Sequence, residues 1–139
     1  GWFGSSTLLK IMPTEFMAND DAPARSGYQG LYIENDTSGK FSVRTNHAST
    51  KMIVTKAIPT GYKATHVKVW GSVGVVNGVK AYSFNHTTGA IATKGLGSIN
   101  SLLNITDIPS SATDNISIQV DTGSTTIFVY GVDITIATI

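Results

Sequence analysis

The sequence contains no cysteine, which excludes disulfides, thiol nucleophiles and zinc held by cysteine. Charged residues are also scarce, at 14% of 139 residues, whereas hydrophobic residues make up 41%. Disordered chains combine many charges with few apolar residues, so this composition predicts a folded chain. The length suits a single domain over residues 1–139. Since the first residue is Gly1 and not methionine, we expect a processed chain, a fragment or a module of a longer protein.

Long hydrophobic runs and clusters of basic residues are missing as well. No apolar stretch approaches the roughly 20 residues that span a bilayer, and no signal peptide is visible, so we expect no membrane insertion. The ten Lys and Arg residues are scattered singly between Lys10 and Lys94, and the net charge is +1. Nucleic-acid-binding proteins concentrate cations along a face or groove, so we expect no nucleic-acid partner.

The chain is rich in β-branched residues, which occur in short runs where apolar and polar side chains alternate. Its helical periodicity is weak. Turn residues separate these runs every 8–15 residues or so, which is typical of a sandwich or jelly roll. We therefore predict an all-β fold: an antiparallel, jelly-roll-like β-sandwich of about eight or nine strands. The expected strands are 8–12, 31–33, 41–43, 52–55, 65–70, 79–84, 91–94, 115–120 and 125–136.

Two segments do not read as strands. Residues 13–27 contain two prolines and an Asn-Asp-Asp string, so we expect a long N-terminal loop, with one short helical turn at 14–16. Residues 98–108 are expected to be either a short helix or an irregular crossover. Three hairpins are predicted from turn chemistry, at 35–39, 86–89 and 121–124.

The C-terminal run carries the clearest alternation. Gly131 in its middle predicts a bulge or bend. The alternation puts Phe128, Tyr130, Val132, Ile134 and Ile136 on one face. Together with the other alternating strands it predicts a buried core of Val67, Val69, Ile116, Ile118, Val120, Phe128, Val132, Ile134 and Ile136.

Catalytic and metal-binding patterns are absent. No Gly-x-Ser-x-Gly elbow occurs, and the three histidines lack zinc-ligand spacing. Asp20 and Asp21 could seat calcium, but an exposed turn explains them better because the EF-hand spacing is missing. We expect no enzymatic activity, no metal and no cofactor.

Aromatic residues are the candidate binding residues. Trp70 lies on the polar face of its predicted strand, beside His66 and Lys68, where it would be a ligand platform or an interface anchor. Tyr82 could stack on a sugar in the same way. Residues 1–7 read as a linker or docking segment, in which Trp2 and Phe3 are expected to dock on another subunit, a neighbouring protein or the parent chain.

One segment of the sequence is more specific than the overall composition, because it resembles a known family. The opening Gly-Trp-Phe-Gly-Ser-Ser-Thr over residues 1–7, followed by Leu-Leu-Lys-Ile-Met-Pro over residues 8–13, resembles the start of virion structural proteins of marine tailed bacteriophages, cyanophages in particular. Residues 58–67, 105–108 and 130–136 resemble further segments of the same proteins. The resemblance spans nearly the whole chain and brings no catalytic residues with it.

Two functions follow as expectations. The first is a structural or attachment component of a phage virion, such as a capsid decoration, tail or fibre module. Its partners would be other virion proteins, its location the extracellular particle and its state a symmetric homo-oligomer, a trimer or higher. The alternative is a carbohydrate-binding module, of a tail fibre or a secreted adhesin, that grips a host surface glycan through its aromatic residues.

Overall fold

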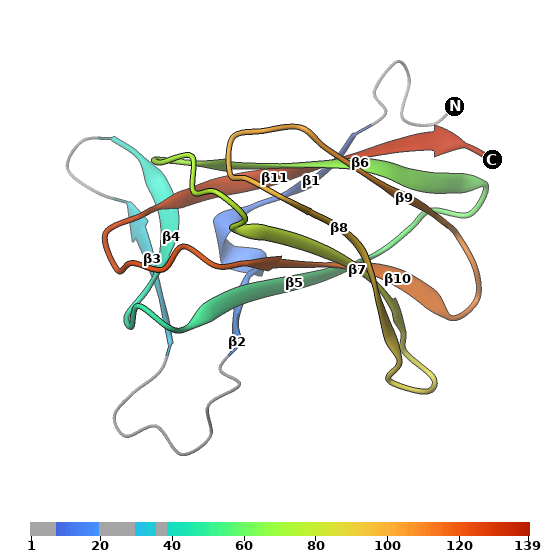
Figure 1. The fold of residues 1–139 in the computed structure, drawn as a ribbon, viewed down its shortest axis with the longest axis horizontal. Coiled ribbons are helices and arrows are strands. Elements are labelled where there is room, and N and C mark those ends of the chain that lie inside the picture. Colours follow the sequence, from blue (N-terminus) through green and yellow to red (C-terminus); the bar gives the residue numbers. More distant parts are fainter. Residues whose placement is uncertain (1–7, 20–29, 36–38) are drawn as a thin grey trace.

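Two antiparallel β-sheets packed face to face form the part of the chain that the computed structural model describes, residues 8–19, 30–35 and 39–139 (Figure 1). The six-stranded sheet consists of β1 (Leu8–Ile11), β3 (Leu31–Asn35), β4 (Phe41–Thr45), β6 (Tyr62–Gly71), β9 (Leu103–Pro109) and β11 (Val129–Thr138). The five-stranded sheet consists of β2 (Met17–Asn19), β5 (Lys51–Ala57), β7 (Val79–Asn85), β8 (Ile91–Gly97) and β10 (Asp114–Val120).

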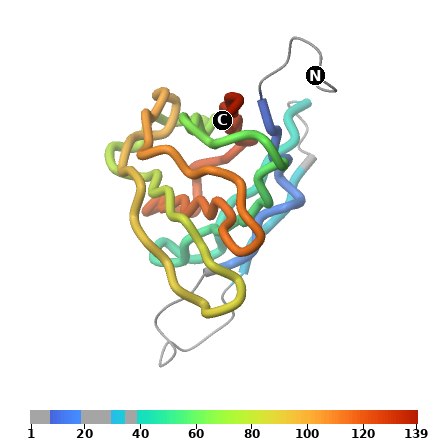
Figure 2. The backbone as a smooth tube through the Cα atoms, turned by 90° about the vertical axis from the view of Figure 1, so that its right-hand side faces the viewer, coloured from blue at the N-terminus to red at the C-terminus, as the bar shows by residue number. Residues whose placement is uncertain are grey.

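The chain crosses repeatedly between the two layers, which gives the jelly-roll-like sandwich that the sequence predicts. In the six-stranded sheet the order is β3-β4-β11-β6-β9, with β1 paired to β11 on the side where β4 also lies. In the five-stranded sheet the order is β2-β5-β10-β7-β8. The blue and cyan strands β1 to β3 lie at one side of the molecule, and the yellow β7–β8 hairpin lies toward the other (Figure 2).

The described residues form eleven strands, more than the eight or nine expected, because two predicted loops contain strands. The three-residue strand β2 lies in the segment expected to be a long loop, and it is a strand only through its pairing with β5. Strand β9 replaces the expected helix or crossover at 98–108. Its buried Ile105 and Ile108 are three residues apart, so its alternation is broken, as is its register with β6. Positions 20–27 of the predicted loop lie outside the described residues.

Two predicted hairpins are confirmed, β3–β4 and β7–β8, and the third is wrong. Strand β10 pairs with β5 and β7, whereas β11 pairs with β1, β4 and β6 in the other sheet. The segment 121–128 therefore crosses between the layers. Packed sheets lie only about 10 Å apart. A segment of this length can therefore connect a strand of one sheet to a strand of the other sheet, just as it can form a hairpin turn within one sheet.

The predicted core is confirmed with one exception. Side chains from the inner faces of both sheets are buried, including Ile118 of β10 and Ile134 of β11. Phe128 was expected to be buried with them, but it is half-buried and precedes β11. Its carbonyl and amide instead bond the Ser72 amide and hydroxyl, both at 2.9 Å.

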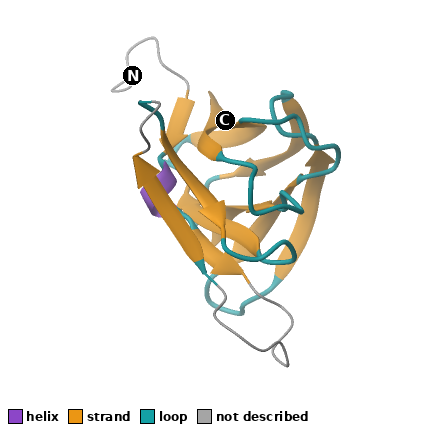
Figure 3. Cartoon of the chain, turned by 90° about the vertical axis from the view of Figure 1, so that its left-hand side faces the viewer, coloured by secondary structure: helices purple, strands orange, loops and turns teal. Residues whose placement is uncertain are grey.

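A single 3₁₀ turn, η1 (Pro13–Glu15), carries the chain from β1 in one sheet to β2 in the other, close to the predicted turn at 14–16 (Figure 3). The Glu15 carboxylate accepts a hydrogen bond from the Met12 amide at 2.6 Å and pairs with the Lys56 ammonium of β5 at 2.5 Å. The hydrogen bond from Lys56 is the main reason that the pKa of Glu15 lies below its ordinary value. Within the described residues no helix is long and apolar enough to cross a membrane.

Candidate functional site

Trp70 lies near the end of β6 on the outer face of the six-stranded sheet, with 42% of its surface exposed. Val67 and Val69 on the same strand are fully buried in the core. Because side chains alternate along a strand, His66, Lys68 and Trp70 must point the other way. The sequence-based prediction that Trp70 occupies the polar face of its strand is confirmed.

The indole ring of Trp70 contacts two neighbouring side chains, one through its N–H group and the other through its aromatic face. Its Nε1–H donates a hydrogen bond to Oδ2 of Asp133 on β11, at 3.0 Å. The Lys68 ammonium lies 4.0 Å from the centre of the ring, a cation–π distance. A large ring held in this way loses little conformational freedom on binding a ligand, so it is well suited to be a binding platform.

Tyr130 joins Trp70 because of a bulge in β11. The register shifts between Val129 and Gly131, so that Val129 faces the core and Gly131 lies opposite Trp70. The extra residue is Tyr130, which the bulge turns to the outer face. The bulge itself was predicted from Gly131, but its consequence was missed: it reverses the expected face of Tyr130 and removes Phe128 from the core.

Gly131 has a second role in shaping the site. A Cβ atom at this position would lie 2.8 Å from the carbonyl oxygen of Ile11, closer than real Cβ contacts. The backbone of β1 can approach β11 here only because residue 131 has no side chain. Gly131 thus permits the close packing of β1 beside the bulge.

These elements enclose a pocket of about 200 Å³ on the outer face of the six-stranded sheet. It is lined by Lys10, Ile11, Met12, Trp70, Tyr130, Gly131, Val132 and Asp133. We call this pocket the Trp70 groove. Its lining combines two aromatic rings, a half-exposed Met12, a carboxylate and an ammonium.

Tyr82, the other described candidate, does not join this site. It lies on β7, on the outer face of the five-stranded sheet, where its hydroxyl donates a hydrogen bond to Oε1 of Gln119 at 3.1 Å. Lys80 lies 5.5 Å from its ring centre. Trp70 and Tyr82 are therefore on opposite sides of the sandwich. Trp2 and Phe3 lie outside the described residues, so their docking stays a prediction.

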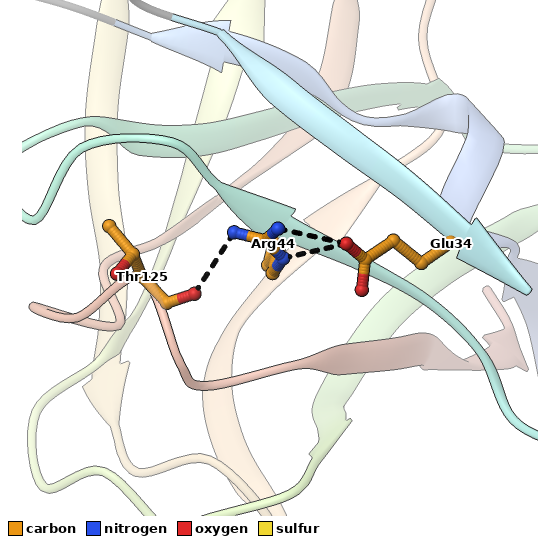
Figure 4. Close-up of polar contacts among 3 residues, drawn as sticks. All are labelled: Glu34, Arg44 and Thr125. Carbon is orange, nitrogen blue, oxygen red and sulfur yellow. Dashed lines mark hydrogen bonds and ion pairs between the residues drawn. The ribbon is translucent and has the colours of Figure 1, made fainter. Parts of the chain in front are cut away.

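A third aromatic cluster occupies the β3–β4 edge of the six-stranded sheet. Arg44 of β4 bonds Oε1 of Glu34 through both Nε and Nη2 at 2.9 Å, and its Nη1 donates to the Thr125 carbonyl at 3.4 Å (Figure 4). The guanidinium also lies 4.5 Å from the Tyr32 ring centre. No sequence pattern indicated this cluster. Its charges pair with each other, which makes it a structural clamp on the edge strand β3.

The three histidines stay apart in the described structure. His86 approaches Asn115, His47 contacts Ser49, and His66 lies on the outer face beside Thr65. Among residues 8–19, 30–35 and 39–139, no three His, Asp or Glu side chains gather in a way that could hold a metal. Asp20 and Asp21 lie outside these ranges, so the metal prediction is not tested there.

Comparisons with known proteins bear on the fold. The chain is similar to the C-terminal CBM6 module of a marine laminarinase from Zobellia galactanivorans, with 15% identity, a TM-score of 0.50, and 92% of this chain and 98% of that chain covered. It is also similar to part of a GH26-CBM35 β-(1,4)-mannanase from Podospora anserina, with 9% identity, a TM-score of 0.50, and 96% and 28% of the chains covered. At these identities the likeness establishes a shared β-sandwich fold.

A third similar structure holds the CBM22 and GH10 modules of an endo-1,4-β-D-xylanase from Clostridium thermocellum, in complex with xylohexaose. Its identity is 16%, its TM-score 0.48, and the match covers 93% of this chain and 27% of that chain. The chain thus spans little more than a quarter of the length of the xylanase and mannanase structures. No protein-family model matches the sequence, and no curated protein matches it.

Proposed function

We propose that this chain is a non-catalytic carbohydrate-binding module, and that it holds a glycan in the Trp70 groove. The observation that carries the proposal is the convergence of Trp70 and Tyr130 from two strands on one solvent-facing pocket with polar groups at its rim. A similar fold in a module of the CBM6 class supports it, because that module is covered over almost its full length.

The chemistry of the groove suits a sugar. The faces of aromatic rings pack against the apolar C–H faces of sugar rings, and the fixed indole has one face that the Lys68 ammonium does not cover. The Asp133 carboxylate accepts hydrogen bonds and the Lys10 ammonium donates them, so both lie where sugar hydroxyls would need partners. The absence of enzymatic activity stays a prediction.

The virion hypothesis stays a prediction. The resemblance to phage structural proteins concerns where the module works, and no observation on the described residues bears on it. A glycan-binding module would serve a tail fibre as well as a secreted protein, so the proposed activity is compatible with either setting.

The test compares aromatic residues on the two sheets. Trp70→Ala and Tyr130→Ala are measured against Tyr82→Ala, a matched aromatic truncation on the opposite sheet, by affinity electrophoresis on a polysaccharide panel and by calorimetry. We expect Trp70→Ala to weaken binding about 30-fold or more, as loss of a central aromatic anchor does. Tyr82→Ala should bind normally, and thermal unfolding should show that all three variants fold.

Two results would contradict the proposal. Binding that survives Trp70→Ala but is lost in Tyr82→Ala would move the site to the five-stranded sheet. If the chain bound no polysaccharide in the panel, the proposed carbohydrate-binding function would be wrong.

A further inference from the structure

Lysine side chains lie beside both aromatic rings of the Trp70 groove. Lys10 lines it, Lys68 lies over the Trp70 ring at 4.0 Å, and Lys40 lies 5.9 Å from the Tyr130 ring centre. The one carboxylate in the lining is Asp133, and one of its oxygens already accepts the indole N–H.

The strand register explains how the two central lysines are placed. Asp133 of β11 lies directly opposite Lys10 of β1 on one side and Lys68 of β6 on the other. Neighbouring strands are about 4.8 Å apart, so the two lysines rise from strands about 10 Å apart, with the Trp70–Asp133 pair beside them. The two lysines therefore flank Asp133, one on each neighbouring strand.

Three other cations of the fold are paired with acidic residues, whereas within the described part of the chain Lys10 and Lys68 are not. Arg44, Lys56 and Lys63 each form an ion pair, with Glu34, Glu15 and Asp107 respectively. Across residues 8–19, 30–35 and 39–139, neither Lys10 nor Lys68 has an acidic partner within ion-pair distance. A cation over an aromatic face still directs N–H groups away from the ring, so the charge of Lys68 also stays available to a ligand.

We infer that the glycan bound in the Trp70 groove is acidic, carrying carboxylate or sulfate groups that Lys10 and Lys68 bind while Trp70 and Tyr130 stack on the sugar rings. This inference rests on the proposed function and names its ligand class. A neutral glycan would cover the ammonium groups without replacing their hydration by an anion. An anionic group on the sugar forms charge-assisted hydrogen bonds with them, which are the stronger kind.

The experiment uses polysaccharides that differ in charge and share a backbone. Polygalacturonate is compared with its fully methyl-esterified form, and κ-carrageenan with agarose, by calorimetry at about 0.05 and 0.5 M NaCl. At least one acidic polysaccharide should bind about tenfold or more tightly than its uncharged counterpart, and added salt should weaken that binding.

Single substitutions then test whether the two lysines cause the preference for acidic polysaccharides. Lys10→Gln and Lys68→Gln should each lower affinity for the acidic polysaccharide about five- to tenfold, and Lys80→Gln, the matched lysine beside Tyr82, should not. Asp133→Asn keeps an oxygen that accepts the indole N–H and removes the carboxylate from the pocket lining, so it should bind the acidic glycan more tightly than the parent chain does.

The outcomes separate this inference from the proposed function. Equal or tighter binding of uncharged polysaccharides, still lost in Trp70→Ala, would overturn the acidic ligand and leave the carbohydrate-binding module standing. No binding to any polysaccharide would overturn both. Equally tight, Trp70-dependent binding of a single-stranded oligonucleotide would show that the groove recognises polyanions in general, which would overturn the glycan assignment.

Discussion

Two strands on opposite sides of the sandwich carry the same short pattern in different surroundings. Lys68-Val69-Trp70 on β6 and Lys80-Ala81-Tyr82 on β7 both place a lysine beside an aromatic ring on an outer sheet face, around a buried residue. On β7, the Tyr82 hydroxyl is bonded to Gln119 of the neighbouring strand.

On β6 the surroundings are different. The bulge in β11 turns Tyr130 outward, Gly131 lets β1 approach, and the three strands enclose the Trp70 groove. The lysine-aromatic pair on β6 thus lies beside a pocket because the β11 bulge and strand β1 border it there. The inner faces of the two sheets, by contrast, are equivalent halves of one core.

The largest expected effect tests that equivalence of the inner faces. Ile118→Ala in β10 and Ile134→Ala in β11 each remove a fully buried side chain, one from each sheet. Each should lower the free energy of unfolding by about 2–5 kcal/mol, measured by chemical denaturation. Ile91→Ala, at a side chain 62% exposed on β8, is the control and should change little. A small effect for only one of the two buried residues would show that the sheets do not share one core.

The next effect concerns strand β1, which borders the Trp70 groove on the outer face of the six-stranded sheet. Gly131→Ala forces a Cβ against the Ile11 carbonyl, so β1 must move away. We expect a loss of about 1–3 kcal/mol in unfolding free energy, as overpacking typically costs, with weaker binding in the groove because Lys10 moves with β1. Thr135→Ala on the same strand is the control, expected to lie within about 0.5 kcal/mol of the parent. Unchanged stability and binding in Gly131→Ala would mean that β1 does not border the Trp70 groove.

The smallest expected effect lies at η1, where the chain passes from the groove-bearing sheet to the other. The pKa of Glu15 is lowered in the folded state, chiefly by the hydrogen bond from Lys56, so the protonated carboxyl is the less stable form there. The stabilisation is therefore present above the ordinary pKa of 4.5 and is lost as the pH falls through the lowered value.

Glu15→Gln should accordingly cost at most about 1 kcal/mol at neutral pH, because the pair is partly exposed. The difference from the parent chain should vanish in strongly acidic solution, as thermal unfolding across a pH series would reveal. Asp107→Gln, which breaks the more exposed Lys63 pair, is the control. A Glu15→Gln penalty that persists at the lowest pH would show that the carboxylate charge is not its source.

Short-range patterns were sufficient for much of the architecture. Alternation identified β6 and β10 and nearly all of their buried residues, since one face of each strand must leave water. Local turn residues correctly predicted the β3–β4 and β7–β8 hairpins, whose strands are adjacent in both sequence and space. Alternation also placed Trp70 on an outer face.

Pairing between distant segments could not be read in this way. A turn at 121–124 looks the same whether the chain folds back or crosses to the other layer, so the assignment of β10 and β11 to different sheets needed the assembled structure. Strands β2 and β9 exist through their pairing with β5 and β6, and neither has an alternation of its own that is strong enough to predict it.

The sequence by itself thus determined an all-β sandwich, its core and one exposed tryptophan, because burial of apolar side chains acts residue by residue along each strand. Only the tertiary structure decided where the candidate site lies. A one-residue bulge reverses the face of Tyr130, and three strands distant in the chain bring Lys10, Trp70 and Asp133 together. Such convergence depends on register between strands, which a local pattern does not encode.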